Sequence, residues 1–181
     1  MIARENLLTT KKNKMVNEKW DRFYLELAEF VANKLSRDPS TKVGAVLVHF
    51  REGIPPLEFI GYNGFPCGVN DSEKYYNDRS LKYPRVVHAE INAILKAGHY
   101  AQGSSLYVFP TFAIPNICGE CAKVALQAGI KELIGWEPTD TEADRERRTR
   151  PRSDGSSWGD SISVSKQMFD QKGLIYRTIV K

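Results

Sequence analysis

The amino-acid sequence predicts a single α/β domain in which helices cover both faces of one sheet of about five strands. The first observation is the order of the expected elements, because a helix and a β-hairpin come first and helices then alternate with strands. The second is composition: 41% of the 181 residues are hydrophobic and 27% are charged, as in a globular domain. A disordered chain would have fewer apolar residues, and a small disulfide scaffold would need more than three cysteines.

Apolar spacing and turn residues justify each element. An apolar stripe from Trp20 to Leu35 recurs every three or four residues and predicts a helix that ends before Pro39. Two runs rich in β-branched and aromatic residues, 43–48 and 57–62, flank Gly53 and two prolines and predict the hairpin. The remaining expected elements are helices at 88–96, 118–128 and 163–169 and strands at 106–109, 132–136 and 174–180.

Two segments fall outside this pattern. Residues 1–18 are polar, rich in lysine and without clear periodicity, so we expect a flexible arm before a domain at 19–181. Residues 137–157 contain Ala143 as their only aliphatic side chain, and their arginines are interspersed with acidic residues. We interpret this second segment as an irregular insertion, and as a solvated loop in preference to a nucleotide or partner site.

Charge and cysteine content narrow the classes of function. The 26 basic and 22 acidic residues give a net charge of +4 and are interspersed, so they do not predict a nucleic-acid surface. No apolar stretch approaches the roughly 20 residues that cross a bilayer, which predicts a cytoplasmic protein without membrane contact. In that reducing compartment, cysteines are more often metal ligands or catalytic groups than disulfides.

His88, Cys118 and Cys121 form the strongest candidate metal site. The two cysteines lie at the start of an expected helix, where they share one face and the helix dipole favours their thiolates. One imidazole and two thiolates suit Zn²⁺, and three protein ligands leave the fourth position for water, as in catalytic sites. Cys67 could complete a structural site instead, but it lies in a Gly- and Pro-rich turn, and we expect an ordinary loop residue.

Glu90 follows His88 by two residues and is the candidate catalytic carboxylate. Positions two apart on a helix point about 200° away from each other, so both can serve one site only from the first turn. Zinc lowers the pKa of a bound water to about 7, and a carboxylate beside that water can take its proton and pass it on. We therefore expect Glu90 to be the proton shuttle for a zinc-activated water.

Several segments together carry a resemblance to a known family. They are Ser36–Ala45, Gly61–Pro66, Lys82–Pro84, His88–Ile94 and Cys121–Lys123. With these segments the chain resembles the deoxycytidylate deaminases of the zinc-dependent cytidine deaminase superfamily. The segments occur in the order typical of that family, and the resemblance runs from about Trp20 to the C-terminus.

The resemblance implies a fold, an activity and partners. The fold would be the three-layer α/β/α cytidine-deaminase-like fold with a central mixed sheet of about five strands. The activity would be hydrolytic deamination of dCMP, or of a 5-substituted dCMP, to dUMP and ammonia, with one zinc ion per subunit, in dTMP biosynthesis. The resemblance further implies a homo-oligomer, with a hexamer favoured, and regulation by dCTP and dTTP with Mg²⁺.

The resemblance also implies substrate contacts. Asn63 would hydrogen-bond the sugar 3′-hydroxyl, and the backbone N–H of Ala89 would contact the edge of the cytosine ring. Arg37 and Lys42 are expected donors to the substrate phosphate, because a dianion in a pocket needs fixed positive partners. The alternatives are that Asn63 only favours a turn conformation and that Arg37 and Lys42 lie on a solvated face.

The loop before Cys118 departs from the family pattern. The family usually has a proline directly before the first metal cysteine, whereas here Asn116 and Ile117 separate Pro115 from Cys118, and the loop is long. It would border the zinc and the base pocket, so the recognised base stays open. Two alternatives remain: a deaminase of bases in tRNA or DNA, and a catalytically silent zinc-containing protein that binds nucleotides.

Overall fold

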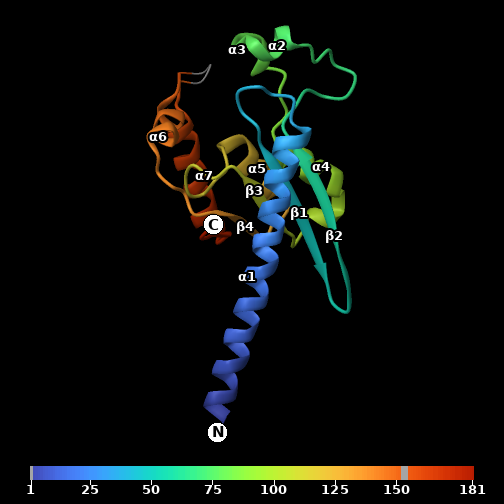
Figure 1. The fold of residues 1–181 in the computed structure, drawn as a ribbon, viewed down its shortest axis with the longest axis vertical. Coiled ribbons are helices and arrows are strands. Elements are labelled where there is room, and N and C mark those ends of the chain that lie inside the picture. Colours follow the sequence, from blue (N-terminus) through green and yellow to red (C-terminus); the bar gives the residue numbers. More distant parts are fainter. Residues whose placement is uncertain (1, 152–154) are drawn as a thin grey trace.

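Five strands form one mixed sheet in the computed structural model, which describes residues 2–151 and 155–181. The strands are β1 (Gly44–Arg51), β2 (Ile54–Tyr62), β3 (Ser105–Phe109), β4 (Glu132–Trp136) and β5 (Ile175–Ile179), and their order in the sheet is β2-β1-β3-β4-β5 (Figure 1). β1 pairs antiparallel with β2 and β3, whereas β3, β4 and β5 are parallel. The predicted mixed sheet of about five strands is therefore confirmed.

The helices are more numerous than the sequence predicts, and α1 and α7 are longer than predicted. The predicted helices correspond to α1 (Ile2–Leu35), α4 (Ala89–Ala97), α5 (Gly119–Gln127) and α7 (Trp158–Lys172). Additional short helices are α2 (Glu73–Asn77), α3 (Arg79–Lys82), the 3₁₀ helix η1 (Gly98–Ala101) and α6 (Glu142–Thr149).

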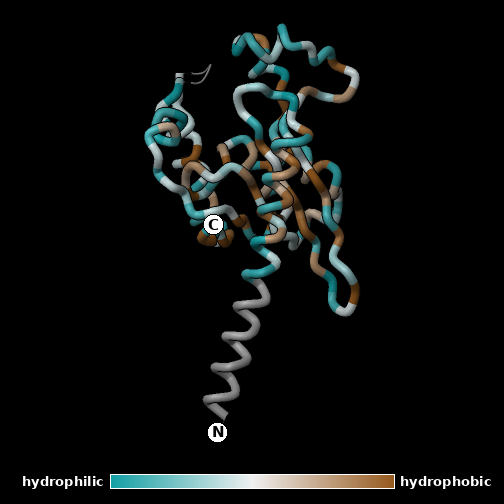
Figure 2. Tube along the Cα trace, in the orientation of Figure 1, coloured by the Kyte–Doolittle hydropathy of each residue, from teal (hydrophilic) through white to brown (hydrophobic). Residues whose placement is uncertain are grey.

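Helices cover both faces of the sheet, which makes three layers. On one face, Val46 and Val48 of β1 pack with Tyr24 and Ala28 of α1. On the other face, Ala45 and Leu47 belong to a larger core that includes residues of α4, α5 and α7. Because successive strand residues point to opposite faces, one short apolar strand fills both cores. Figure 2 shows hydrophobic residues along the strands of the sheet.

Two glycines allow helices to lie very close to the hairpin. A Cβ atom on Gly44 would lie 2.1 Å from the Ala28 carbonyl oxygen of α1. A Cβ atom on Gly61 would lie 2.0 Å from the carbonyl oxygen of Ala89, the first residue of α4. The missing side chain of Gly61 lets α4 lie directly against β2, and this contact fixes the position of the α4 N-terminus.

The insertion that we expected to be irregular contains α6. This helix begins with a capping box, in which the Thr141 hydroxyl accepts from the Asp144 N–H and the Asp144 carboxylate accepts from the Thr141 N–H. These hydrogen bonds satisfy two donors at the helix start and stabilise a helix that lacks an apolar stripe. The expectation of irregular structure over 137–157 is wrong for residues 142–149, while 152–154 lie outside the described residues.

The N-terminal segment is helical. Residues 2–18, for which we expect a flexible arm, form the first part of α1, and their flexibility stays a prediction (Figure 1). Among the described residues, no helix is both long enough and apolar enough to span a membrane.

Candidate active site

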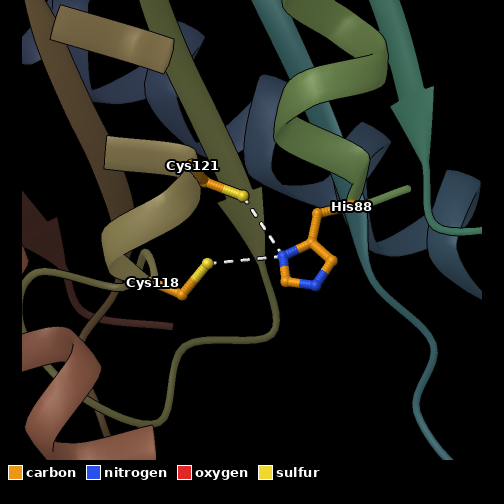
Figure 3. Close-up of side chains that lie close together, drawn as sticks. All are labelled: His88, Cys118 and Cys121. Carbon is orange, nitrogen blue, oxygen red and sulfur yellow. Dashed lines mark hydrogen bonds between the residues drawn. The ribbon is translucent and has the colours of Figure 1, made fainter. Parts of the chain in front are cut away.

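His88, Cys118 and Cys121 come together where the N-termini of two helices meet. His88 is the N-cap of α4, Cys118 is the N-cap of α5, and Cys121 lies in the first turn of α5. The Nδ1 atom of His88 lies 3.2 Å from the Cys121 sulfur and 3.4 Å from the Cys118 sulfur (Figure 3). The predicted convergence of these three side chains is confirmed.

The three ligand atoms fit a zinc ion. They all lie within 4.8 Å of one another. A tetrahedral ion with bonds of about 2.0 Å to nitrogen and 2.3 Å to sulfur would hold N and S atoms about 3.5 Å apart, close to the separations here. Of the residues that the structure describes, no fourth His, Cys, Asp or Glu joins the cluster, and Cys67 is exposed elsewhere. This donor set is that of a catalytic rather than a structural site.

The electrostatics of the two thiols also suit a cation. Hydrogen bonds from Cys121 and from His88 lower the pKa of the Cys118 thiol to about 4. The pKa of Cys121 is raised, because it donates to Cys118 and because it is buried. The pair therefore carries one thiolate near neutral pH, and a bound cation would favour ionisation of the second thiol.

Glu90 lies in the first turn of α4, beside the three ligands. Its carboxyl lines the same pocket as His88 and Cys118, although only 5% of the residue is exposed. Burial raises its pKa, which brings proton uptake and release closer to neutral pH. Because His88 occupies the N-cap position and Glu90 follows in the first turn, both side chains reach one site, as helical geometry requires.

The pocket around this centre has a volume of about 100 Å³. Its walls come from the loop after α1, the α3 region, the loop before Cys118, α6 and the start of α7. The charged side chains that line it are Asp38, Arg79, Lys82, Glu90, Arg147 and Arg150. Trp158 of α7 also lines it, with its ring 5.8 Å from that of His88, measured between centroids.

One pocket wall is held together by a buried ion pair. The Lys82 ammonium lies 3.1 Å from the Asp38 carboxylate and donates to the Ser40 hydroxyl at 2.7 Å. Asp38 also accepts from the backbone N–H groups of Ser40 and Thr41. The two segments around Asp38 and Lys82, which the sequence singled out separately, are thus neighbours in space.

Asn63 lines the pocket and also supports the loop before β1. Its side-chain oxygen accepts from the Ser36 hydroxyl at 2.7 Å and the Val43 N–H at 2.8 Å, and its amide donates to the Thr41 carbonyl at 2.8 Å. An amide group has two N–H donors. Asn63 can therefore support this loop and still offer one N–H to a ligand.

The other predicted substrate residues lie in different places. Ala89 is buried at the first position of α4, where backbone N–H groups have no partner within the helix. Arg37 is exposed and pairs with Asp71 at 2.5 Å. Lys42 is exposed and donates to the Asn33 carbonyl at 3.4 Å. Arg37 and Lys42 do not line the pocket, so this placement gives no support to their predicted phosphate contacts.

Sequence reasoning missed the cations that do line the pocket. Arg79, Lys82, Arg147 and Arg150 reach it from α3 and from the end of α6. For the last two, a signal existed in the spacing of Thr141 and Asp144, which matches a helix cap and predicts that the arginines after it share a helix. No local signal indicated that this helix would pack beside the pocket.

Comparison with known proteins agrees with this geometry. A family model described as the cytidine and deoxycytidylate deaminase zinc-binding region matches residues 18–136, which include the three ligands and Glu90. The chain is 35% identical over 158 residues to an "uncharacterized deaminase in luxG 3′ region" of Aliivibrio fischeri, covering 86% of this chain and 90% of that protein. It is 32% identical over 169 residues to the deoxycytidylate deaminase of Homo sapiens, covering 89% and 80% of the two chains.

A solved structure shares the fold. The crystal structure of the dCMP deaminase from the cyanophage S-TIM5, in complex with dCMP and dUMP, matches with a TM-score of 0.57 at 23% identity. The match covers 89% of this chain and 97% of that one. The three-layer arrangement with a mixed sheet is therefore that of a known deaminase fold.

Proposed function

We propose that this chain, which belongs to the cytidine and deoxycytidylate deaminase family, hydrolyses dCMP to dUMP and ammonia. The observation that carries the proposal is the convergence of His88, Cys118 and Cys121 at one end of a pocket that Glu90 also lines. Relatives named deoxycytidylate deaminase that match most of the chain support dCMP as the substrate.

The residues of the site divide the chemistry between them. His88, Cys118 and Cys121 would hold zinc, which when bound activates a water molecule for attack on the ring carbon that carries the amino group. The Glu90 carboxylate would accept one proton of this water and pass it to the ring nitrogen. It would then take the second proton of the same water, from the hydroxyl added to the ring carbon, and deliver it to the departing amine, which leaves as ammonia. Its burial supports this role, because a raised pKa suits a group that both takes and gives a proton.

Substitution of Glu90 tests the proposal. Glu90→Gln keeps the shape of the side chain but cannot take up a proton, so ammonia release from dCMP should fall by at least ~100-fold, while bound zinc, measured by metal analysis, stays stoichiometric. The matched control is Glu120→Gln, because Glu120 is exposed on α5 and pairs with Lys123. Full activity of Glu90→Gln would contradict the assignment.

The substrate panel separates the alternatives. The panel contains dCMP, a 5-substituted dCMP, deoxycytidine and a cytosine-containing oligonucleotide. Reaction of the oligonucleotide alone would indicate a polynucleotide deaminase, and nucleotide binding without turnover would indicate a silent binding protein. Either result would contradict the proposal.

Further properties are proposed on the same basis. We expect Asn63 and the Ala89 N–H to contact the sugar and the base. We expect a homo-oligomer, and exposed aromatic side chains on α1 support an interface there, namely Trp20, Phe23 and Phe30. A hexamer is favoured by the family resemblance alone. Light scattering tests the number of subunits. Ammonia release measured with added dCTP or dTTP and Mg²⁺ tests the expected regulation. Cell fractionation tests the expected cytoplasmic location.

A further inference from the structure

The arginine-rich insertion packs against the long loop that precedes Cys118. The Arg148 guanidinium donates to the Phe112 carbonyl at 2.6 Å, and the Arg147 guanidinium lies 5.8 Å from the centroid of the Phe112 ring. Phe112 itself lines the pocket. The two segments therefore form one continuous wall of the pocket.

This wall is anchored at both ends of α6. At the N-terminal end, the capping box joins Thr141 to Asp144, and Asp140 pairs with Arg148. At the C-terminal end, Pro151 forms an isolated antiparallel bridge with Ser157, the N-cap of α7. The backbone of α6 is thus held in place beside the pocket.

Arg147 and Arg150 occupy the exposed end of the pocket. Arg147 is exposed and Arg150 half-buried, whereas Glu90 and Cys118, which line the same pocket, are buried. Arg150 pairs with Glu146 at 3.3 Å, and such an exposed pair is weak and readily exchanged.

The pocket carries an excess of positive charge at this exposed end. Six charged side chains line the pocket, four basic and two acidic. One basic residue, Lys82, is neutralised by one acidic residue, Asp38. The other acidic residue, Glu90, is buried beside the metal ligands. The three arginines are exposed or half-buried, and no further acidic side chain lines the pocket with them.

We propose that Arg147 and Arg150 bind the 5′-phosphate of the substrate and so make the insertion the element that selects a nucleotide over a nucleoside. The inference rests on the proposed function, because the base must reach Glu90 at the buried end and its phosphate then lies toward the entrance. A phosphate carries nearly two negative charges near pH 7. The planar guanidinium group pairs with phosphate oxygens through two parallel hydrogen bonds.

Steady-state kinetics of the zinc-loaded enzyme test the inference. In the variant Arg147→Ala/Arg150→Ala, the KM for dCMP should rise by about tenfold for each arginine lost, with kcat little changed. The kcat/KM for deoxycytidine should stay the same, since the nucleoside has no phosphate. Replacement of both arginines by lysine keeps the charge without the paired geometry and should give an intermediate KM.

Arg145→Ala is the matched control. Arg145 lies on the same helix and pairs with Asp140, but it does not line the pocket, so its loss should leave the KM for dCMP unchanged. An unchanged KM in the double variant would overturn the inference, as would an equal loss of activity on dCMP and deoxycytidine. Loss of the dCMP preference in Arg37→Ala or Lys42→Ala alone would also overturn it.

Direct binding separates this inference from the proposed function. If the wild-type enzyme releases no ammonia from dCMP, the proposed function fails. Calorimetry of the zinc-loaded protein with dCMP and with deoxycytidine then decides the inference. Tighter binding of dCMP that disappears in the double variant supports it, and equal affinities of the wild-type protein for both compounds overturn it.

Discussion

Lys82 is a buried lysine whose environment explains how separate parts of the chain form one pocket wall. Its side chain is 4% exposed, and that of its partner Asp38 is 3% exposed. A buried lysine is stable as a cation only when a counter-charge and hydrogen bonds replace its hydration. Asp38 supplies the charge, and Ser40 supplies an acceptor. The pair fixes the loop between α1 and β1 against the end of α3.

Lys82→Met should therefore destabilise the protein strongly. It leaves the Asp38 carboxylate buried without its counter-charge, so the free energy of unfolding, measured with urea in the presence of zinc, should fall by about 3–5 kcal/mol. The control Lys123→Met breaks an exposed pair and should cost less than about 1 kcal/mol. The double variant Asp38→Asn/Lys82→Met should recover part of the loss. Equal effects of Lys82→Met and Lys123→Met would contradict this account.

At this scale, the sequence predicted the metal ligands but not the pocket cations. Cys118 and Cys121 are three residues apart, and Glu90 follows His88 by two residues. Such short spacings can be read directly from the sequence and indicate metal ligands with a nearby catalytic carboxylate. Arg147 lines the pocket where α6 packs against the loop at Phe112, and the Arg148–Phe112 hydrogen bond there joins positions 36 residues apart. Arg37 and Lys42 lie close to the first strand in sequence, yet their side chains pair with groups outside the pocket.

Among the elements, α6 shows how polar contacts can define a helix without an apolar stripe. Hydrophobic periodicity could not predict it, because Ala143 is its only aliphatic residue. The strands and the four predicted helices were recognised because each buries apolar side chains at a regular period. α6 depends instead on its capping box and on the pairing of Asp140 with Arg148 and Arg145.

The stability that Asp140 contributes should depend on pH. A hydrogen bond from Arg148, together with the charge of Arg145, holds the pKa of Asp140 below its usual range. A carboxyl whose pKa is lower in the folded than in the unfolded chain stabilises the fold above the unfolded pKa of about 4. That contribution is lost as the pH falls through the lowered value.

The variant Asp140→Asn tests this pH dependence. Asp140 has a φ of 49°, a conformation that asparagine also tolerates, so the substitution changes charge without backbone strain. The difference in Tm between wild type and variant should be present at pH 7 and should shrink at pH 3. Because protonation of the zinc ligands affects both proteins alike, it cancels in this difference. A difference that stays constant over this range would show that Asp140 contributes through something other than its charge.

In the whole molecule, the sheet and the glycine contacts bring two helix N-termini to one point. Gly61 allows α4 to lie against β2, and parallel pairing of β3 with β4 places α5 beside it. The ligands are thus supplied by elements that are 30 residues apart in sequence, at His88 and Cys118. A metal bound between them links the two helices across the larger core.

Removal of zinc should therefore destabilise the whole domain rather than the site alone. A ligand that binds only the folded state at a thousand times its Kd adds about 4 kcal/mol of stability. For a chain of this size, that loss corresponds to a fall in Tm of roughly 8–16 °C. Scanning calorimetry with and without a chelator measures the shift, and zinc added back should restore the original Tm.

The Cys118→Ser/Cys121→Ser variant should already melt at the lower temperature and should not respond to chelator. Metal analysis should first confirm that the chelator has removed the zinc. If the Tm of the wild-type protein is then unchanged, packing of α4 and α5 alone holds the site together.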